Sequence, residues 1–368
     1  MKLFILSHKV SIGGGQEYVT KKIVEKYLQA GFKVHVICME TDLQPNSNLK
    51  LTKIHLPKKP AALSFPLFVI VASLLIVIFK RKGDISYSCG ISSFWKIDFI
   101  GIHFCMSAFR SLNVTRQGYK ASLMRRINMK IDSAIHAALE RFVAKGFRGT
   151  YIPISKGLGS DLENFLKIPI QQIRVIPNGT TFVPVKAGRD GEIPSLKRRN
   201  LLFIGGDWGR KGLALLMESL SFVENWTLDV IGTGNIEDYK KLASEKGVED
   251  RITFHGHKKD VTPFIRNAQF VILPSFYEGL PISLLEAISL GTPIIYTKIN
   301  GSEELFGRFK PGILIDDNRI PTLVDTLKGS YHENTWRYMH NEAIKLAEEM
   351  DFENSLEKYV SLFSSAVT

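Results

Sequence analysis

Residues 274–287, PSFYEGLPISLLEA, join a predicted strand to a predicted helix. An apolar run at 270–273 precedes them, and a helix-like run begins near Pro281. Glu278 falls in the connecting loop, and Glu286 falls in the first turns of the helix. Open parallel sheets bind ligands at such junctions, where backbone N–H groups and the positive end of a helix point at an anion. We therefore expect the two carboxylates to line a ligand site.

Strand-like and helical runs alternate through most of the chain, which predicts parallel sheets with right-handed crossovers. With 368 residues the chain is long for one core and suits two domains of roughly 150–200 residues each. A polar segment with Pro and Gly, at about 177–199, separates the two runs. The sequence thus predicts an α/β protein with Rossmann-like domains at 1–180 and 181–351.

The charge is spread unevenly over the two halves. Residues 1–189 hold 28 Lys and Arg against 10 Asp and Glu, whereas residues 190–368 hold 20 against 26. A basic half indicates contact with an anionic surface or substrate. No aromatic-interleaved RNA-binding pattern, zinc finger or helix-turn-helix is evident, so nucleic acid is not an expected partner. An anionic membrane or a phosphorylated lipid acceptor fits the charge better.

Cysteine usage and the N-terminus favour a protein of the reducing cytosol. Cys38, Cys89 and Cys105 have no zinc-like spacing, so we expect reduced core thiols. The first apolar residues run directly into a glycine loop, as in a first strand, and no signal-peptide cleavage region follows. No DxD-like metal motif is evident either, because Asp316 and Asp317 come after the main motifs. We expect neither an obligatory metal nor another cofactor.

The spacing of Glu278 and Glu286 resembles the E-x7-E signature of glycosyltransferase family 4, the retaining enzymes of GT-B fold. Further matches to that family are Asn178-Gly179, Gly232-Thr233-Gly234 and His255-Gly256-His257. The resemblance implies a GT-B fold, with two Rossmann-like domains facing each other across a cleft. It also implies that a last helix, at about 352–368, packs back on the N-terminal domain, although a simple cap on the second domain would fit the same sequence.

By this resemblance the second domain binds the sugar donor, and residues 203–212, FIGGDWGRKG, carry the cations. Arg210 and Lys211 would hold the diphosphate and stabilise the charge of the leaving nucleotide. Many family members have an arginine where this chain has Gly206, and we take Arg210 as its replacement. Glu278 would hold hydroxyls of the transferred sugar, and Glu286 would hold the ribose. The other expected donor contacts are Gly205, Gly232, Gly256, His257, Gly279, Leu280, Ile282, Ser283 and Leu284.

Two features of the first domain complete the expected site. Gly14 and Gly15 belong to a glycine run after the first strand, which lets the backbone approach a phosphate closely but also fits a flexible turn. The resemblance assigns these glycines to the donor diphosphate and the acceptor. His103, at the end of a strand-like run, would face the reacting side of the sugar, although histidines at strand ends are often structural. The expected catalytic residues are therefore His103, Glu278, Arg210 and Lys211.

Residues 61–79 are almost wholly apolar and are flanked by Lys58-Lys59 and Lys80-Arg81-Lys82. Their length just reaches that of a membrane-spanning helix. Three interpretations remain open from the sequence: a core helix of the α/β layer, a spanning helix, and a helix that is partly core and partly in the membrane interface. We favour the last.

Together the motifs predict a retaining hexosyltransferase on the inner face of the plasma membrane. Its donor would be a nucleotide sugar, most simply UDP-linked, and its acceptor a glycan or lipid-linked hydroxyl in polysaccharide or lipopolysaccharide synthesis. Two alternatives stay open, a sugar-nucleotide epimerase of the same fold and a catalytically silent sugar- or lipid-binding homologue. The sequence does not specify the sugar, the acceptor or the linkage.

Overall fold

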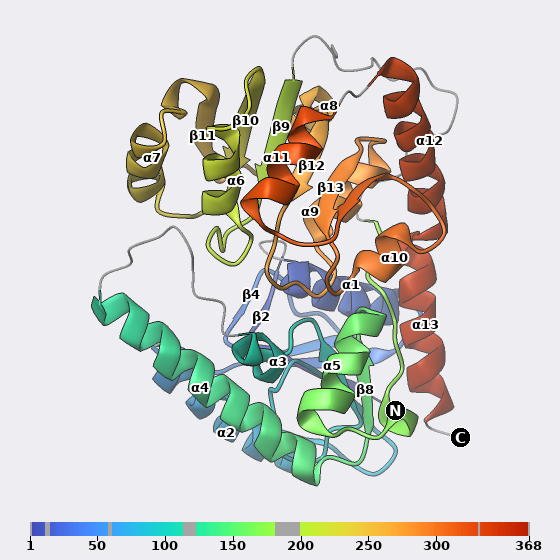
Figure 1. Cartoon of the computed structure of the whole chain (residues 1–368). Coiled ribbons are helices and arrows are strands. Elements are labelled where there is room, and N and C mark those ends of the chain that lie inside the picture. The colour runs from blue at the N-terminus through green and yellow to red at the C-terminus, as the bar shows by residue number, and fades with distance from the viewer. Residues whose placement is uncertain are drawn as a thin grey trace. The chain divides into compact units, whose positions relative to one another are not determined.

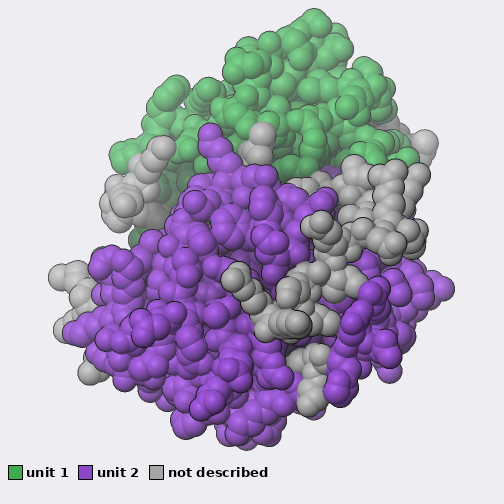
Figure 2. All heavy atoms as spheres, turned by 90° about the horizontal axis from the view of Figure 1, so that it is seen from above, with its two compact units in different colours: residues 1–113, 121–178, 353–368 green, residues 114–120, 179–352 purple. Residues whose placement is uncertain are grey.

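The computed structural model describes residues 2–11, 15–57, 61–112, 123–180, 199–329 and 332–366. They form two compact units (Figures 1 and 2). Unit 1 takes in the described residues up to Asn178 and again those from Glu353, and unit 2 takes in those of Gly179–Phe352. After Phe352 the described chain returns to unit 1 in its last helix.

Unit 1 is built on a six-stranded parallel sheet in the order β5-β3-β1-β6-β7-β8. Its strands are β1 (Lys2–Leu6), β3 (Lys33–Cys38), β5 (Leu49–Lys53), β6 (Ile85–Cys89), β7 (Phe99–Ile102) and β8 (Thr150–Pro153). A short parallel pair, β2 (Lys9–Val10) with β4 (Glu40–Thr41), lies outside this sheet. The helices of the unit are α1 (Gly15–Gln29), α2 (Ala61–Phe79), α3 (Met106–Ser111), α4 (Leu123–Gly146), α5 (Lys156–Leu166) and α13 (Phe352–Ser365), with the 3-10 turn η1 (Ile170–Gln172).

Unit 2 repeats this plan with the order β11-β10-β9-β12-β13-β14. Its strands are β9 (Arg199–Ile204), β10 (Trp226–Ile231), β11 (Ile252–Gly256), β12 (Phe270–Leu273), β13 (Ile294–Thr297) and β14 (Gly312–Ile315). Its helices are α6 (Leu213–Leu220), α7 (Ile236–Glu245), α8 (Thr262–Asn267), α9 (Ile282–Ser289), α10 (Ser302–Phe306), α11 (Ile320–Lys328) and α12 (Glu333–Glu349), with the 3-10 turn η2 (Glu249–Arg251). The strand order reverses between β9 and β12, as it does between β1 and β6 in unit 1. This is the Rossmann order, and ligands bind at such a reversal.

The central strands are apolar because helices cover a parallel sheet and leave it little contact with water. All four residues of β12, Phe270–Leu273, are fully buried. The strands β5 and β14, which the sequence did not predict, are both at sheet edges and are only partly buried. Beyond β8, Ile173 makes an isolated parallel bridge to Tyr151.

The last helix, α13, packs inside unit 1. The Phe363 ring lies 4.6 Å from Phe99 and 5.7 Å from Tyr27, measured between centroids. Ser355 donates a hydrogen bond to the Pro177 carbonyl at 2.8 Å. An aromatic cluster thus joins the C-terminal helix to strands and helices from the start of the chain.

Candidate donor-binding site

The candidate site of unit 2 lies where its strand order reverses. Strands β9 and β12 are neighbours in the sheet, so the loops that follow them leave the same edge. The Phe276 N–H donates to the Arg210 carbonyl at 2.9 Å and ties the two loops together. Gly212 allows this approach, because a Cβ atom there would lie 2.1 Å from the Pro274 carbonyl oxygen. Its φ of +81° also favours glycine.

Two cations from one loop converge on a carboxylate from the other. Nζ of Lys211 and a guanidinium nitrogen of Arg210 each lie 2.8 Å from Oε1 of Glu278. Ser275 donates to the same oxygen at 3.2 Å. Glu278 is 6% exposed and Lys211 is 9% exposed, so water screens these charges poorly. The expected cation pair and the first glutamate therefore form one compact cluster.

The protonation states follow from this arrangement. Burial opposes ionisation of Glu278, but Lys211 and Arg210 outweigh it and lower the pKa of the carboxyl. Burial likewise opposes the charge on Arg210, and Glu278 and Asp207 reverse that effect and raise the pKa of the guanidinium. The buried centre of the cluster therefore holds two cations and the carboxylate of Glu278, and the more exposed carboxylate of Asp207 pairs with Arg210 at its edge.

Backbone and side-chain groups fix the direction of Arg210. Its guanidinium donates to the Tyr277 carbonyl and to Oδ2 of Asp207, the latter at 3.2 Å. The sequence analysis missed Asp207, Ser275 and the Tyr277 carbonyl as members of the cluster. The position of Asp207, three residues before Arg210 in the same turn, was the available signal.

Gly205 after β9, Gly232 after β10 and Gly256 at the end of β11 form a row along this edge of the sheet. Gly205 donates to the Ile231 carbonyl, and Gly232 donates to the Gly256 carbonyl, both at 2.9 Å. A Cβ atom at Gly205 would lie 2.3 Å from Cδ of Lys211, and one at Gly232 would lie 1.8 Å from the Gly205 carbonyl oxygen. The missing side chains leave room for the lysine to reach Glu278.

The far end of the row is open. Around a Cβ atom built at Gly256 the structure places nothing within 4 Å. His257, the next residue, is exposed. These two expected donor contacts therefore border accessible space rather than a packed core.

Glu286 differs from Glu278 in its surroundings. It lies in the second turn of α9, is half-buried, and has no side-chain partner among the described residues. Burial without a compensating cation raises the pKa of its carboxyl to about 7. A half-buried carboxylate with no side-chain partner among the described residues is suited to accept hydroxyl groups from a ligand.

Of the three residues at the start of α9 that were expected to contact the donor, two have a backbone N–H group that is free within the described chain. The Leu284 N–H donates to the Pro281 carbonyl at 3.1 Å, so it is already used. The amides of Ile282 and Ser283 have no backbone acceptor among the described residues, as expected of the first helical turn. Gly279 and Leu280 lie in the preceding loop, where a side chain at Gly301 would press on the Gly279 carbonyl. We therefore retain two of the three predicted amides as anion ligands.

The expected residues of unit 1 are considered separately. His103 directly follows β7 and is half-buried, and its Nε2 is enclosed without a partner within the described chain. Burial lowers the pKa of its imidazole to about 4, so the ring is neutral at physiological pH. Gly15 begins α1, next to the reversal of strand order, while Gly14 lies outside the described residues.

The described residues contain no group of three or more His, Cys, Asp or Glu that could hold a metal ion. The carboxylate of Asp317 is paired with Arg319. Cys38, Cys89 and Cys105 are buried free thiols.

Comparison with known proteins identifies the family that the second half of the chain resembles. Residues 198–332 match the family described as glycosyl transferases group 1. These residues are similar to a glycosyl transferase domain. The match covers the loop that carries Arg210 and Lys211, both glutamates and the glycine row of unit 2.

Relatives extend the likeness beyond that domain. An uncharacterised glycosyltransferase of Methanocaldococcus jannaschii is 24% identical over 327 residues, which cover 83% of this chain and 82% of the relative. A UDP-Gal:alpha-D-GlcNAc-diphosphoundecaprenol alpha-1,3-galactosyltransferase of Escherichia coli is 28% identical over 177 residues, 44% of this chain and 46% of the relative. This second match spans about half the length of that enzyme.

Solved structures confirm the fold. The crystal structure of WaaG, a glycosyltransferase involved in lipopolysaccharide biosynthesis, superposes with a TM-score of 0.78 at 17% identity, covering 98% of this chain and 99% of that one. The predicted resemblance to glycosyltransferases of GT-B fold is thereby confirmed, as are the two Rossmann-like halves.

Proposed function

We propose that this chain is a retaining hexosyltransferase of family 4 that uses a UDP-sugar and a glycan or lipid-linked acceptor. The observation that carries the proposal is the cation pair of Arg210 and Lys211, which meets Glu278 where the strand order of the glycosyl transferase domain reverses. In support, the Escherichia coli relative is named for a UDP-linked donor and a lipid diphosphate acceptor. WaaG is named for lipopolysaccharide biosynthesis.

The cluster is suited to a diphosphate. Both cations share the buried carboxylate of Glu278, and only Arg210 has a second, more exposed partner in Asp207, so a ligand with two phosphate charges would compete for them. The free amides of Ile282 and Ser283 add donors at the positive end of α9. We assign Arg210 and Lys211 to the diphosphate of the donor.

The two glutamates would hold the two ends of the donor. Oε2 of Glu278 accepts no hydrogen bond from the described residues and is assigned to hydroxyls of the transferred sugar. Glu286 is assigned to the ribose hydroxyls, because its half-buried carboxyl has no side-chain partner among the described residues. Gly256 and His257, at the open end of the glycine row, are assigned to the base.

The proposed reaction retains configuration at the anomeric carbon. The bond from that carbon to the phosphate oxygen breaks, a bond to the acceptor oxygen forms on the same face, and the leaving phosphate accepts the acceptor proton. Arg210 and Lys211 stabilise the charge that develops on the leaving diphosphate. The neutral imidazole of His103 is assigned a hydrogen bond to the sugar. We propose that neither a metal nor another cofactor is required.

The test is to incubate the purified protein with a panel of UDP-, GDP- and ADP-sugars, with and without lipid-diphosphate acceptors, and to identify the products. We expect acceptor-dependent transfer from a UDP-sugar, with the anomeric configuration of the donor kept in the product. Inversion would reject the retaining assignment. Interconversion of the nucleotide sugar without an acceptor would identify an epimerase instead, and binding without turnover would identify a silent homologue.

A further inference from the structure

Helix α2 is part of the fold of unit 1 through one of its faces. Phe68, Val69, Ala72 and Ile76 on that face are fully buried. Ser73, also buried, accepts a hydrogen bond from the Phe94 N–H at 2.9 Å. A membrane-spanning α2 would have to leave this packing and break the bond. The helix is long and apolar enough to span by composition, but 33% of residues 62–79 are buried inside the structure.

The opposite face of α2 is apolar and exposed. Ile78 is 70% exposed, and the helix contains no charged residue. The large exposed side chains recur at helical spacing and form one stripe: Leu63, Ile70, Leu74, Val77 and Ile78. Soluble surfaces carry single exposed apolar residues, but a contiguous stripe of this length marks an interaction site.

The adjacent helix α4 continues this surface, since the two helices pack side by side (Figure 1). Ile127, Ile131 and Phe142 are exposed on it, Phe142 by 62%. The Phe142 ring also contacts Phe94, next to Trp95, whose indole is 56% exposed. We call the α2 stripe, the three α4 residues and Trp95 the α2–α4 face.

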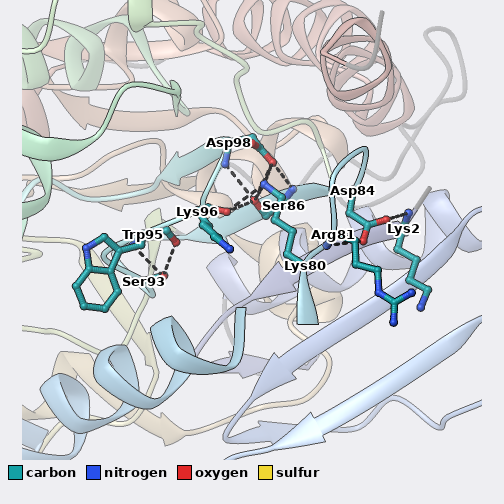
Figure 3. Close-up of polar contacts among 9 residues, drawn as sticks. All are labelled: Lys2, Lys80, Arg81, Asp84, Ser86, Ser93, Trp95, Lys96 and Asp98. Atoms are coloured by element: carbon teal, nitrogen blue, oxygen red, sulfur yellow. Dashed lines mark hydrogen bonds and ion pairs between the residues drawn. The ribbon is translucent and has the colours of Figure 1, made fainter. Parts of the chain in front are cut away.

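Exposed cations accompany this face. Arg81 and Lys82 follow α2 directly, and Lys130, Arg141 and Lys145 lie on α4. None of these five forms an ion pair within the described residues. Lys80 differs, because it is bound internally to Asp98 and Ser86, while the Arg81 guanidinium and the Trp95 indole take no part in these contacts (Figure 3).

Two acidic groups near this face accept backbone hydrogen bonds. Glu140 of α4 accepts the N–H groups of Met106 and Ser107 at the start of α3. Asp84 accepts the backbone N–H groups of Lys2 and Arg81 (Figure 3). The five exposed cations beside the apolar stripe therefore outnumber these carboxylates together with Asp132 of α4.

We propose that the α2–α4 face docks unit 1 on an anionic lipid bilayer, with α2 lying in the interface rather than spanning it. Apolar side chains with a tryptophan and flanking Lys and Arg match the acyl boundary and the phosphate layer of such a surface. A second copy of this chain would bring like charges together and fits less well. The proposal extends the proposed function, since a lipid-linked acceptor lies in such a membrane, but it rests on α2 and α4 alone.

The experiment measures co-sedimentation of the full chain with vesicles of phosphatidylcholine plus phosphatidylglycerol and with vesicles of phosphatidylcholine alone. One variant combines Ile70→Ser, Leu74→Ser and Ile78→Ser, and a second combines Arg141→Gln and Lys145→Gln. The matched controls are Phe222→Ser, an exposed apolar residue of unit 2, and Arg266→Gln with Lys328→Gln, exposed cations of unit 2. All changed residues are exposed, and circular dichroism verifies folding.

We expect binding to the anionic vesicles that weakens with salt and is released by alkaline carbonate. The apolar variant should lower the partition coefficient at least about tenfold, and the charge variant about fivefold for each cation removed. The controls should match the wild type. The affinity of the same variants for UDP should equal that of the wild type. If the wild type itself does not bind UDP, that result contradicts the proposed function and leaves the docking proposal to the vesicle experiment.

Three results would overturn the docking proposal. The first is wild-type protein that does not bind anionic vesicles, and the second is variants that bind these vesicles as tightly as the wild type. The third is protein that stays on the vesicles in alkaline carbonate, which would indicate a membrane-spanning helix. A wild-type dimer that the apolar variant converts to a monomer in light scattering would assign the face to self-association instead.

Discussion

Nζ of Lys211 lies 2.8 Å from Oε1 of Glu278, although the two residues are 67 positions apart in the chain. They follow the two strands between which the sheet order of unit 2 reverses. Arg210 lies equally close to the same oxygen, so the two cations of the site share one buried carboxylate. The following predictions test what this arrangement does.

Lys211→Ala should weaken UDP binding at least about tenfold in isothermal titration, because a buried charge-assisted contact to the diphosphate is lost. Lys328→Ala, which removes an exposed lysine of the same unit, is the control and should bind like the wild type. Equal affinity of Lys211→Ala and wild type would remove Lys211 from the diphosphate site.

Glu278→Gln should separate stability from binding. The free energy of unfolding should fall by about 3 kcal/mol in urea denaturation, because two buried cations lose their partner. UDP supplies new negative charge to them, so UDP should raise the melting temperature of this variant more than that of the wild type. Sugar transfer should fall, since the sugar hydroxyls lose a carboxylate.

The control for that variant is Glu237→Gln, whose exposed pair with Lys240 contributes little to stability. A smaller UDP shift in Glu278→Gln than in the wild type would show that Glu278 does not compete with the diphosphate.

Glu286 should make nucleoside binding depend on pH. Its pKa of about 7 means that the carboxyl gains its charge as pH rises through neutrality, and the ionised form accepts hydroxyl groups best. Uridine affinity should therefore increase from about pH 6 to about pH 8. Uridine is used because it carries no phosphate that titrates in this range.

In Glu286→Gln the uridine affinity should be lower and flat with pH. The raised pKa of Glu286 also makes the free energy of unfolding depend on pH. A carboxyl whose folded pKa is raised stabilises the protein most below its unfolded value of 4.5, and this contribution is lost as pH rises through about 7. Urea titrations at several pH values should show the slope in the wild type, and a slope retained in Glu286→Gln would contradict the assignment.

Gly212→Ala should destabilise unit 2 by about 2–4 kcal/mol and weaken UDP binding. Its added methyl would meet the Pro274 carbonyl, which is backbone and cannot swing away, and its φ of +81° costs a further strain. Gly247→Ala is matched for backbone conformation, with a φ of +64°, but meets nothing within 4 Å. It should cost only about 1 kcal/mol in the same unfolding experiment. Equal losses would show that the close approach of the two loops has no energetic role.

Much of unit 2 could be predicted from sequence, because its buried strands are apolar and its loops carry Gly and Pro. The glutamate motif at 274–287 correctly placed Glu278 in a loop and Glu286 on a helix. The edge strands β5 and β14 were missed, since half-exposed strands need few apolar residues. Asp207 and Ser275 were missed because their contacts depend on how two loops meet.

The amino-acid sequence by itself determined the alternation of strands and helices, the glycine turns and the types of charge at the site, because these depend on local pattern and composition. Only the tertiary structure decided that Lys211 meets Glu278, since this requires β9 and β12 to be neighbours in the sheet. It also decided which face of α2 is core. An almost wholly apolar helix has no periodicity that distinguishes its sides, and only packing against unit 1 leaves one side uncovered.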